Sequence, residues 1–159
     1  GDKYEAVFEV RGTEPASKDE AKTVYDAAVL DKDGNEHKLS SLVKEGKLSG
    51  KSGKTVVFQD PFQLARDLEE TEEAREVIGA FAELHEMLLN RGETVWAGNI
   101  LMAQYMPEVM KLVAERRIFN ATSIGADTIV TACVGEYVSL NNVEQDKVKI
   151  LSIEDLILG

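Results

Sequence analysis

The chain contains a single cysteine, Cys133, among its 159 residues. One thiol rules out an internal disulfide and cannot supply the several thiolates that an iron–sulfur cluster needs. Histidine is almost as scarce, because His37 and His85 are the only two. No His/Cys pair has the spacing of a zinc site. From the residues alone we therefore expect no metal centre.

Positive charge and long apolar runs are also in short supply. The 18 Lys and Arg residues face 29 Asp and Glu residues, which gives a net charge of −11. An acidic surface repels phosphate groups, so we expect neither nucleic-acid binding nor membrane-surface binding. No apolar run approaches the roughly 20 residues that cross a bilayer. Residues 1–5 do not resemble a secretory signal, and one cysteine suits a reducing compartment, so the chain is predicted to be cytoplasmic.

The length suits one compact unit made of two parts. Residues 1–53 form an N-terminal extension with turn and linker signals at its end. There we expect strands at residues 6–10 and 23–30, a tight turn at Asp33-Gly34, a returning strand at 35–39, a short helix over 40–46 and a polar linker at 49–54. The extension is therefore predicted to contain a β-hairpin.

Residues 54–159 alternate strand-like and helix-like segments. Strands are expected at residues 55–58, 94–96, 129–132 and 147–151, and helices at 63–70, 72–89, 99–120 and 153–157. This order predicts an α/β fold with a small, mainly parallel sheet flanked by helices. Met102, Met106, Met110 and Val113 share one face of the third helix, which we interpret as core filling.

Three loops follow predicted strands and carry the chemistry of interest. They contain Asp60-Pro61-Phe62, Trp96-Ala97-Gly98-Asn99 and Cys133-Val134-Gly135-Glu136. The carboxyl ends of parallel strands lie at one edge of a sheet, so these loops should converge there.

The same loops resemble the motifs of a known family. Gln59-Asp60-Pro61-Phe62-Gln63-Leu64-Ala65-Arg66 is similar to His-Asp-Pro-Cys-His-Leu-x-Arg, Trp96-Ala97-Gly98 to Cys-Cys-Gly, and Cys133-Val134-Gly135-Glu136 to Cys-Pro-x-Cys. These motifs belong to the CCG domain, the cysteine-rich module of the heterodisulfide reductase B-subunit family and related Fe–S oxidoreductases. The gaps agree, with 33 residues between Phe62 and Trp96 and 35 between Ala97 and Cys133. The resemblance covers about residues 54–158.

The resemblance implies a cluster site that has lost its ligands. The family binds a 4Fe-4S cluster through cysteines, whereas Phe62, Trp96, Ala97 and Glu136 replace four of those five positions and only Cys133 remains. It therefore implies a cluster-free CCG-like domain that acts as a structural or interaction module without redox activity. Its implied partner is another redox subunit or a second CCG domain; the oligomeric state stays open.

We also expect the two aromatic residues to fill the vacated volume. An unfilled core cavity costs about 24 cal/mol per Å³, so Phe62 and Trp96 would stabilise the fold by plugging the former cluster site. Two other functions stay open: a thiol-dependent oxidoreductase that uses Cys133, and a small-ligand site between Phe62 and Trp96. The supporting residues are Asp60, Pro61, Arg66 and Gly98. Asp60 is expected to cap the helix that follows Pro61, with acid–base work as the alternative, and Arg66 is the candidate partner of its carboxylate.

Overall fold

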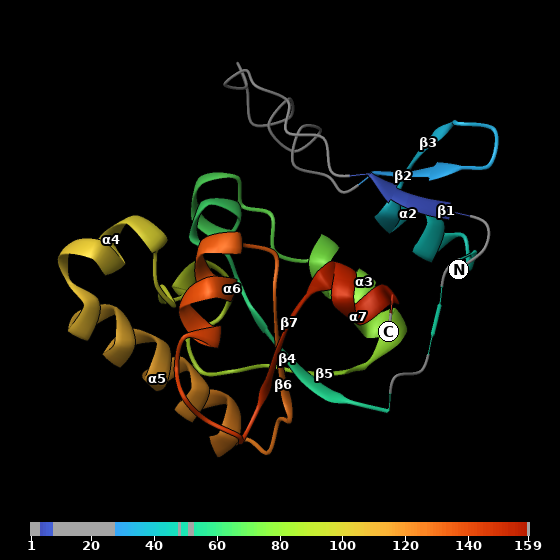
Figure 1. Ribbon diagram of the computed structural model, residues 1–159. Coiled ribbons are helices and arrows are strands. Elements are labelled where there is room, and N and C mark those ends of the chain that lie inside the picture. Colours follow the sequence, from blue (N-terminus) through green and yellow to red (C-terminus); the bar gives the residue numbers. More distant parts are fainter. Residues whose placement is uncertain (1–3, 8–27, 48, 51–52, 159) are drawn as a thin grey trace.

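The protein has an α/β fold, which confirms the predicted fold class (Figure 1). The computed structural model describes residues 4–7, 28–47, 49–50 and 53–158. Its larger sheet is parallel and has the strand order β5-β4-β6-β7. These strands are β4 (Thr55–Gln59), β5 (Glu83–His85), β6 (Thr128–Thr131) and β7 (Lys149–Ser152).

The two central strands form because short apolar, β-branched runs can be buried on both faces. Val56 and Val57 of β4, and Ile129 and Val130 of β6, are completely buried. Val57 pairs with Ile129 in the parallel register. Strands of this kind need helices on both sides of the sheet.

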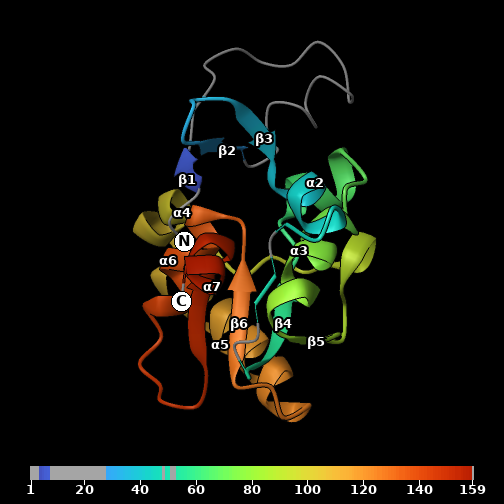
Figure 2. The same ribbon diagram turned by 90° about the vertical axis from the view of Figure 1, so that its right-hand side faces the viewer.

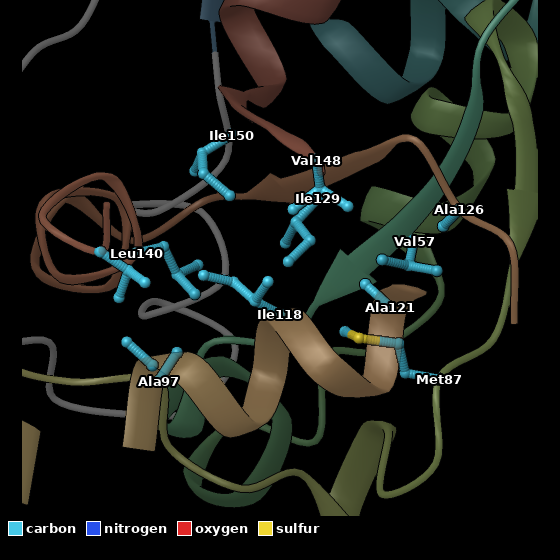
Figure 3. Packing of buried hydrophobic residues seen from close by; sticks show 12 residues of the cluster. Val57, Met87, Ala97, Ile118, Ala121, Ala126, Ile129, Leu140, Val148 and Ile150 are labelled. Atoms are coloured by element: carbon cyan, nitrogen blue, oxygen red, sulfur yellow. The ribbon is translucent and has the colours of Figure 1, made fainter. Parts of the chain in front are cut away.

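Helices cover both faces (Figures 1 and 2). On one face lie α5 (Pro107–Ser123) and α6 (Val134–Asn141), with α4 (Ile100–Tyr105) beside them. On the other lie α3 (Glu73–Phe81) and α7 (Ile153–Leu158). Figure 3 shows the first core, where Ile118 of α5 and Leu140 of α6 lie near Ile129 of the sheet. The sheet thus separates two hydrophobic cores.

The N-terminal part adds a small antiparallel sheet with the order β1-β2-β3. It consists of β1 (Tyr4–Val7), β2 (Ala28–Asp31) and β3 (Glu36–Lys38), followed by α2 (Leu39–Lys44). The predicted hairpin is confirmed: the Asp31 carboxylate accepts hydrogen bonds from the Asp33 and Asn35 amides across the turn. Leu42 of α2 packs into the second core with Phe81. The predicted strand segments at 8–10 and 23–27 lie outside the described residues.

The predicted bounds of two helices were wrong. The helix expected over residues 72–89 ends at Phe81, Ala82 is extended, and the chain enters edge strand β5. The helix expected over 99–120 is broken at Met106, because Pro107 has no amide hydrogen to donate and instead begins α5. Met106 is consequently exposed, and of the three methionines only Met110 is buried in the core.

Two shorter segments also differ from expectation. Residues 94–96 form an irregular loop and no strand. Residues Gln63–Asp67 form a single π-helical turn, η1, where an α-helix was expected. Both segments lie beside the loops that form the candidate site. Across the described part of the chain, no helix is both long enough and apolar enough to span a bilayer.

Candidate functional site

The candidate site lies at the carboxyl edge of the parallel sheet, above β4 and β6. The connection from β4 runs through α3 to β5, whereas the connection from β6 runs through α6 to β7 on the opposite side of β4. Loops diverge at such a switch point and leave a crevice, where α/β proteins usually bind ligands. The three loops singled out from the sequence all reach this edge.

Glu136 joins these three loops. Its side chain is completely buried, and its Oε1 accepts one hydrogen bond from the Ala97 amide and one from Gln59 Nε2, each at 3.1 Å. Gln59 ends β4, Ala97 belongs to the middle loop, and Glu136 lies in the first turn of α6. One carboxylate oxygen therefore ties together the three segments that the sequence predicted to converge.

Gln59 extends this network to α5. Its Oε1 accepts a hydrogen bond from Arg117 Nε at 2.6 Å, and its Nε2 also donates to the Val95 carbonyl at 3.0 Å. Arg117 Nη1 donates to the Leu88 carbonyl at 3.0 Å. Among these three side chains, two buried atoms have no hydrogen-bond partner in the described part of the chain: Arg117 Nη2 and Glu136 Oε2. We call Gln59, Arg117 and Glu136 the inner polar network.

Burial controls the charge state of this network. Desolvation raises the pKa of Glu136 to about 7, and the Ala97 amide, Gln59 and Arg117 only partly oppose it. Desolvation also lowers the pKa of Arg117. The nearby Asp60 carboxylate further favours the neutral form of Glu136. The Glu136 carboxyl group therefore titrates near neutral pH.

Asp60 belongs to a second cluster, and the expected helix cap and pairing with Arg66 were both wrong. Its carboxylate forms a two-pronged ion pair with Arg75, with N–O distances of 2.6 and 2.8 Å, and accepts a hydrogen bond from the Arg91 amide. It does not cap the turn that follows Pro61, because the residue before η1 is Phe62 and no side chain caps η1. Arg66 instead donates to the Thr94 carbonyl. An aspartate before a proline resembles a cap in sequence, whereas here it anchors a distant arginine.

Phe62 and Trp96 do not plug the site. Phe62 is 37% exposed, and the two rings line a pocket of about 280 Å³ together with Gln63 and Asn99. A plug that fills the volume between the loops leaves no pocket there. The Arg66 guanidinium lies 4.5 Å from the centroid of the Phe62 ring. The plug hypothesis is therefore wrong, and the rings form the walls of an open pocket.

Cys133 is a half-buried residue at the start of α6. Its amide donates to Thr131 Oγ1 at 3.2 Å, and its side chain caps no helix amide. Nearby, Gly98 has a φ of +132° and a Cβ there would overlap Ser139. Only glycine fits this position, which lets the middle loop approach α6 closely. Pro61, the other supporting residue, is buried.

The residues present do not fit an iron–sulfur cluster. Of the five positions that the resemblance assigns to cluster ligands, only Cys133 carries a thiol, and Glu136 Oε1 is already committed to two donors. A 4Fe-4S cluster is ordinarily held by four thiolates. Within the described ranges, no group of three or more His, Cys, Asp or Glu side chains is arranged to hold a metal ion.

Sequence reasoning missed Gln59, Arg75 and Arg117 as site residues. Arg117 shares helical spacing with the buried Met110, Ala114, Ile118 and Ala121, whereas its neighbour Arg116 is exposed, so periodicity was the signal that could have found it. Gln59 was noted only as part of a motif. A polar residue that ends a run of buried strand residues is a weak signal, and it was the only one available for Gln59.

No protein-family model matches the chain, and neither a curated protein nor a solved structure matches it.

Proposed function

We propose that this chain is a cluster-free CCG-like domain, related to the heterodisulfide reductase B-subunit family, that serves as a structural or interaction module. In this proposal, hydrogen bonds to Glu136 replace the iron–sulfur cluster as the link between the three loops. The module itself transfers no electrons, because a lone thiol at Cys133 has no resolving partner within the chain.

The position of Glu136 is the observation that carries the proposal. When Cys133-Val134-Gly135-Glu136 is aligned with the family motif Cys-Pro-x-Cys, Glu136 occupies the position of the second cysteine. In the structure its Oε1 lies 3.1 Å from Gln59 Nε2 and 3.1 Å from the Ala97 amide. Those two groups come from the other two motifs. A cluster held by thiolates from the same three segments would link the same loops, so one acidic side chain can preserve the scaffold after the ligands are lost.

An exposed apolar surface supports the interaction role. On α4 and at the start of α5, several large apolar side chains face solvent: Ile100, Leu101, Tyr105, Met106, Val109 and Leu112. Exposed apolar side chains that gather on one face are typical of protein–protein contact sites. The partner that the proposal favours is another redox subunit or a second CCG domain, in a cytoplasmic setting.

Restoring cysteines at the positions that the resemblance assigns to cluster ligands tests whether the three loops have the geometry of a cluster site. In the triple variant Phe62→Cys, Trp96→Cys, Ala97→Cys, four thiols are available with Cys133, and Glu136 still links the loops. We expect this variant, incubated anaerobically with ferrous iron and sulfide, to bind iron and sulfide in equal amounts and to gain visible charge-transfer absorption.

The matched control adds Cys133→Ala to the triple variant and should lose most of the bound iron. Far-UV circular dichroism checks that both variants are folded. If the folded triple variant takes up no more iron and sulfide than the control, the three loops do not have the geometry of a cluster site and the family assignment fails.

A further inference from the structure

The pocket between Phe62 and Trp96 has properties that the proposed function does not use. Its volume is about 280 Å³, and its lining is Phe62, Gln63, Trp96 and Asn99. It lies at the switch point of the parallel sheet, the edge where α/β folds bind ligands. Two aromatic rings on one small pocket favour a flat guest, because aromatic pairs gain about 0.5–1.5 kcal/mol beyond their buried area.

The charges around the pocket favour a neutral guest. None of its four lining residues is ionisable, and residues 94–107 contain no charged side chain. The Arg66 guanidinium already lies over the Phe62 ring, so a second cation there would be repelled. An anion would approach a protein of net charge −11. The Arg66 guanidinium is engaged with the Phe62 ring and the Thr94 carbonyl and is not among the lining residues, so either ion would be buried in the pocket without a charged partner, which is costly.

The volume of the pocket and its polar groups further limit the class of ligand. An apolar cavity of about 150 Å³ holds one benzene ring, so this pocket has room for two fused rings. The Asn99 Oδ1 is committed to the amides of Leu101 and Met102 at the start of α4. The Asn99 side chain can therefore offer a ligand only its Nδ2 group, which is a donor and suits a hydrogen-bond acceptor at the edge of the ligand.

We propose that this pocket is a binding site for a neutral, planar molecule of two fused aromatic rings that carries a hydrogen-bond acceptor, with Phe62 and Trp96 as its walls. The site does not depend on the origin of the loops, because it rests on the lining of the pocket alone. If the cysteine-restored variant bound no cluster, the ligand-site proposal would still stand. If no ligand bound the pocket, the proposed relation to the CCG domain would still stand.

Three probes that differ only in charge test the proposal: 2-naphthylmethanol, 2-naphthoate and 2-naphthylmethylammonium. Trp96 is the only tryptophan, so its single indole N–H signal in a 15N-labelled sample reports directly on the pocket wall. We expect 2-naphthylmethanol to shift this signal saturably and to bind at least about tenfold more tightly than either charged probe, because burying an unpaired charge is costly.

Phe62→Ala should weaken 2-naphthylmethanol binding about tenfold while the protein remains folded in far-UV circular dichroism, since Phe62 is partly exposed. The matched control is Phe119→Ala on α5, where Phe119 is 68% exposed and lines no part of this pocket. The control should bind as the parent chain does. No saturable shift with the neutral probe, equal binding of all three probes, or equal effects of the two alanine variants would overturn the proposal.

Discussion

At the scale of single residues, Glu136 is where burial and charge conflict most directly. Its carboxyl group is completely buried, its Oε1 accepts two hydrogen bonds, and its Oε2 accepts none. An ionised carboxylate with an unpartnered oxygen is costly in the interior. The neutral form avoids that cost and keeps the Oε1 acceptor. The side chain therefore links the loops at the expense of stability at higher pH.

The Glu136→Gln substitution should make this cost visible. Desolvation raises the pKa of Glu136 from 4.5 to about 7. A raised acid pKa contributes stability that is fully present below pH 4.5 and is lost as pH rises through about 7. We expect the unfolding free energy of the parent chain, relative to Glu136→Gln, to fall by on the order of 3 kcal/mol from pH 4.5 to 8.

Urea denaturation at several pH values measures this difference. Glu144→Gln is the matched control, because Glu144 is exposed and the same substitution there should leave the pH profile of the parent unchanged. A constant difference between the parent chain and Glu136→Gln across the range would show that Glu136 does not titrate as described.

Gly98 is a second residue whose identity is dictated by its surroundings. Its φ of +132° and the overlap of a Cβ with Ser139 should make Gly98→Ala cost at least about 2 kcal/mol of unfolding free energy. Gly79→Ala is the control, since Gly79 lies in α3 with open space around it and should gain up to about 1 kcal/mol. Thermal or urea unfolding measures both. Equal effects at the two positions would contradict the close packing of the middle loop on α6.

At the scale of elements, the ion pair between Asp60 and Arg75 holds α3 against the loop after β4. Both side chains are almost fully buried, and Arg75 also binds Glu86 at 2.7 Å. Removing one partner of a buried pair leaves the other charge uncompensated, which costs about 3–5 kcal/mol. We expect Arg75→Met to destabilise the protein by that amount in urea denaturation.

An exposed ion pair on the same helix supplies the comparison. Lys44 of α2 lies 2.9 Å from Glu76 of α3, and both side chains are largely in solvent. Lys44→Met should therefore cost no more than about 1 kcal/mol. If the two methionine variants were equally stable, the buried pair would not be what fixes α3 at the site.

The elements that sequence predicted well are those with one clear periodicity. The central strands β4 and β6 were expected because buried β-branched runs have few alternatives. Edge strand β5 was predicted as helix, since Glu83–His85 has helix-forming neighbours and no apolar run. Its conformation comes from parallel pairing with β4, a tertiary effect that local propensity does not contain. Pro107 was the available signal for the break between α4 and α5.

For the site, the sequence predicted which loops meet and failed to predict how they are joined. Loop convergence follows from parallel strands, so residues 59–62, 96–99 and 133–136 could be placed together. The buried partners Arg75 and Arg117 lie on helices 15 and 58 residues along the chain from Asp60 and Gln59, and their pairing depends on helix packing. The exposure of Phe62 depends equally on packing, which is why the plug hypothesis failed.

At the scale of the whole molecule, the chain combines an acidic surface with one uncharged, apolar region. The net charge is −11, yet residues 94–107 carry no charge and include the exposed Leu101 and Tyr105. Like-charged copies repel one another, so the acidity opposes self-association. An acidic surface together with exposed apolar residues fits the proposed role of a module that contacts a different chain.

Iron and acid-labile sulfide in the unaltered protein, purified and analysed without oxygen, test the central claim most directly. The cluster-free proposal predicts that neither element is present above the trace level of a Cys133→Ala sample, and that the visible spectrum is featureless. Stoichiometric iron and sulfide that disappear in Cys133→Ala would contradict it, because a cluster would then be bound by ligands other than the family's set.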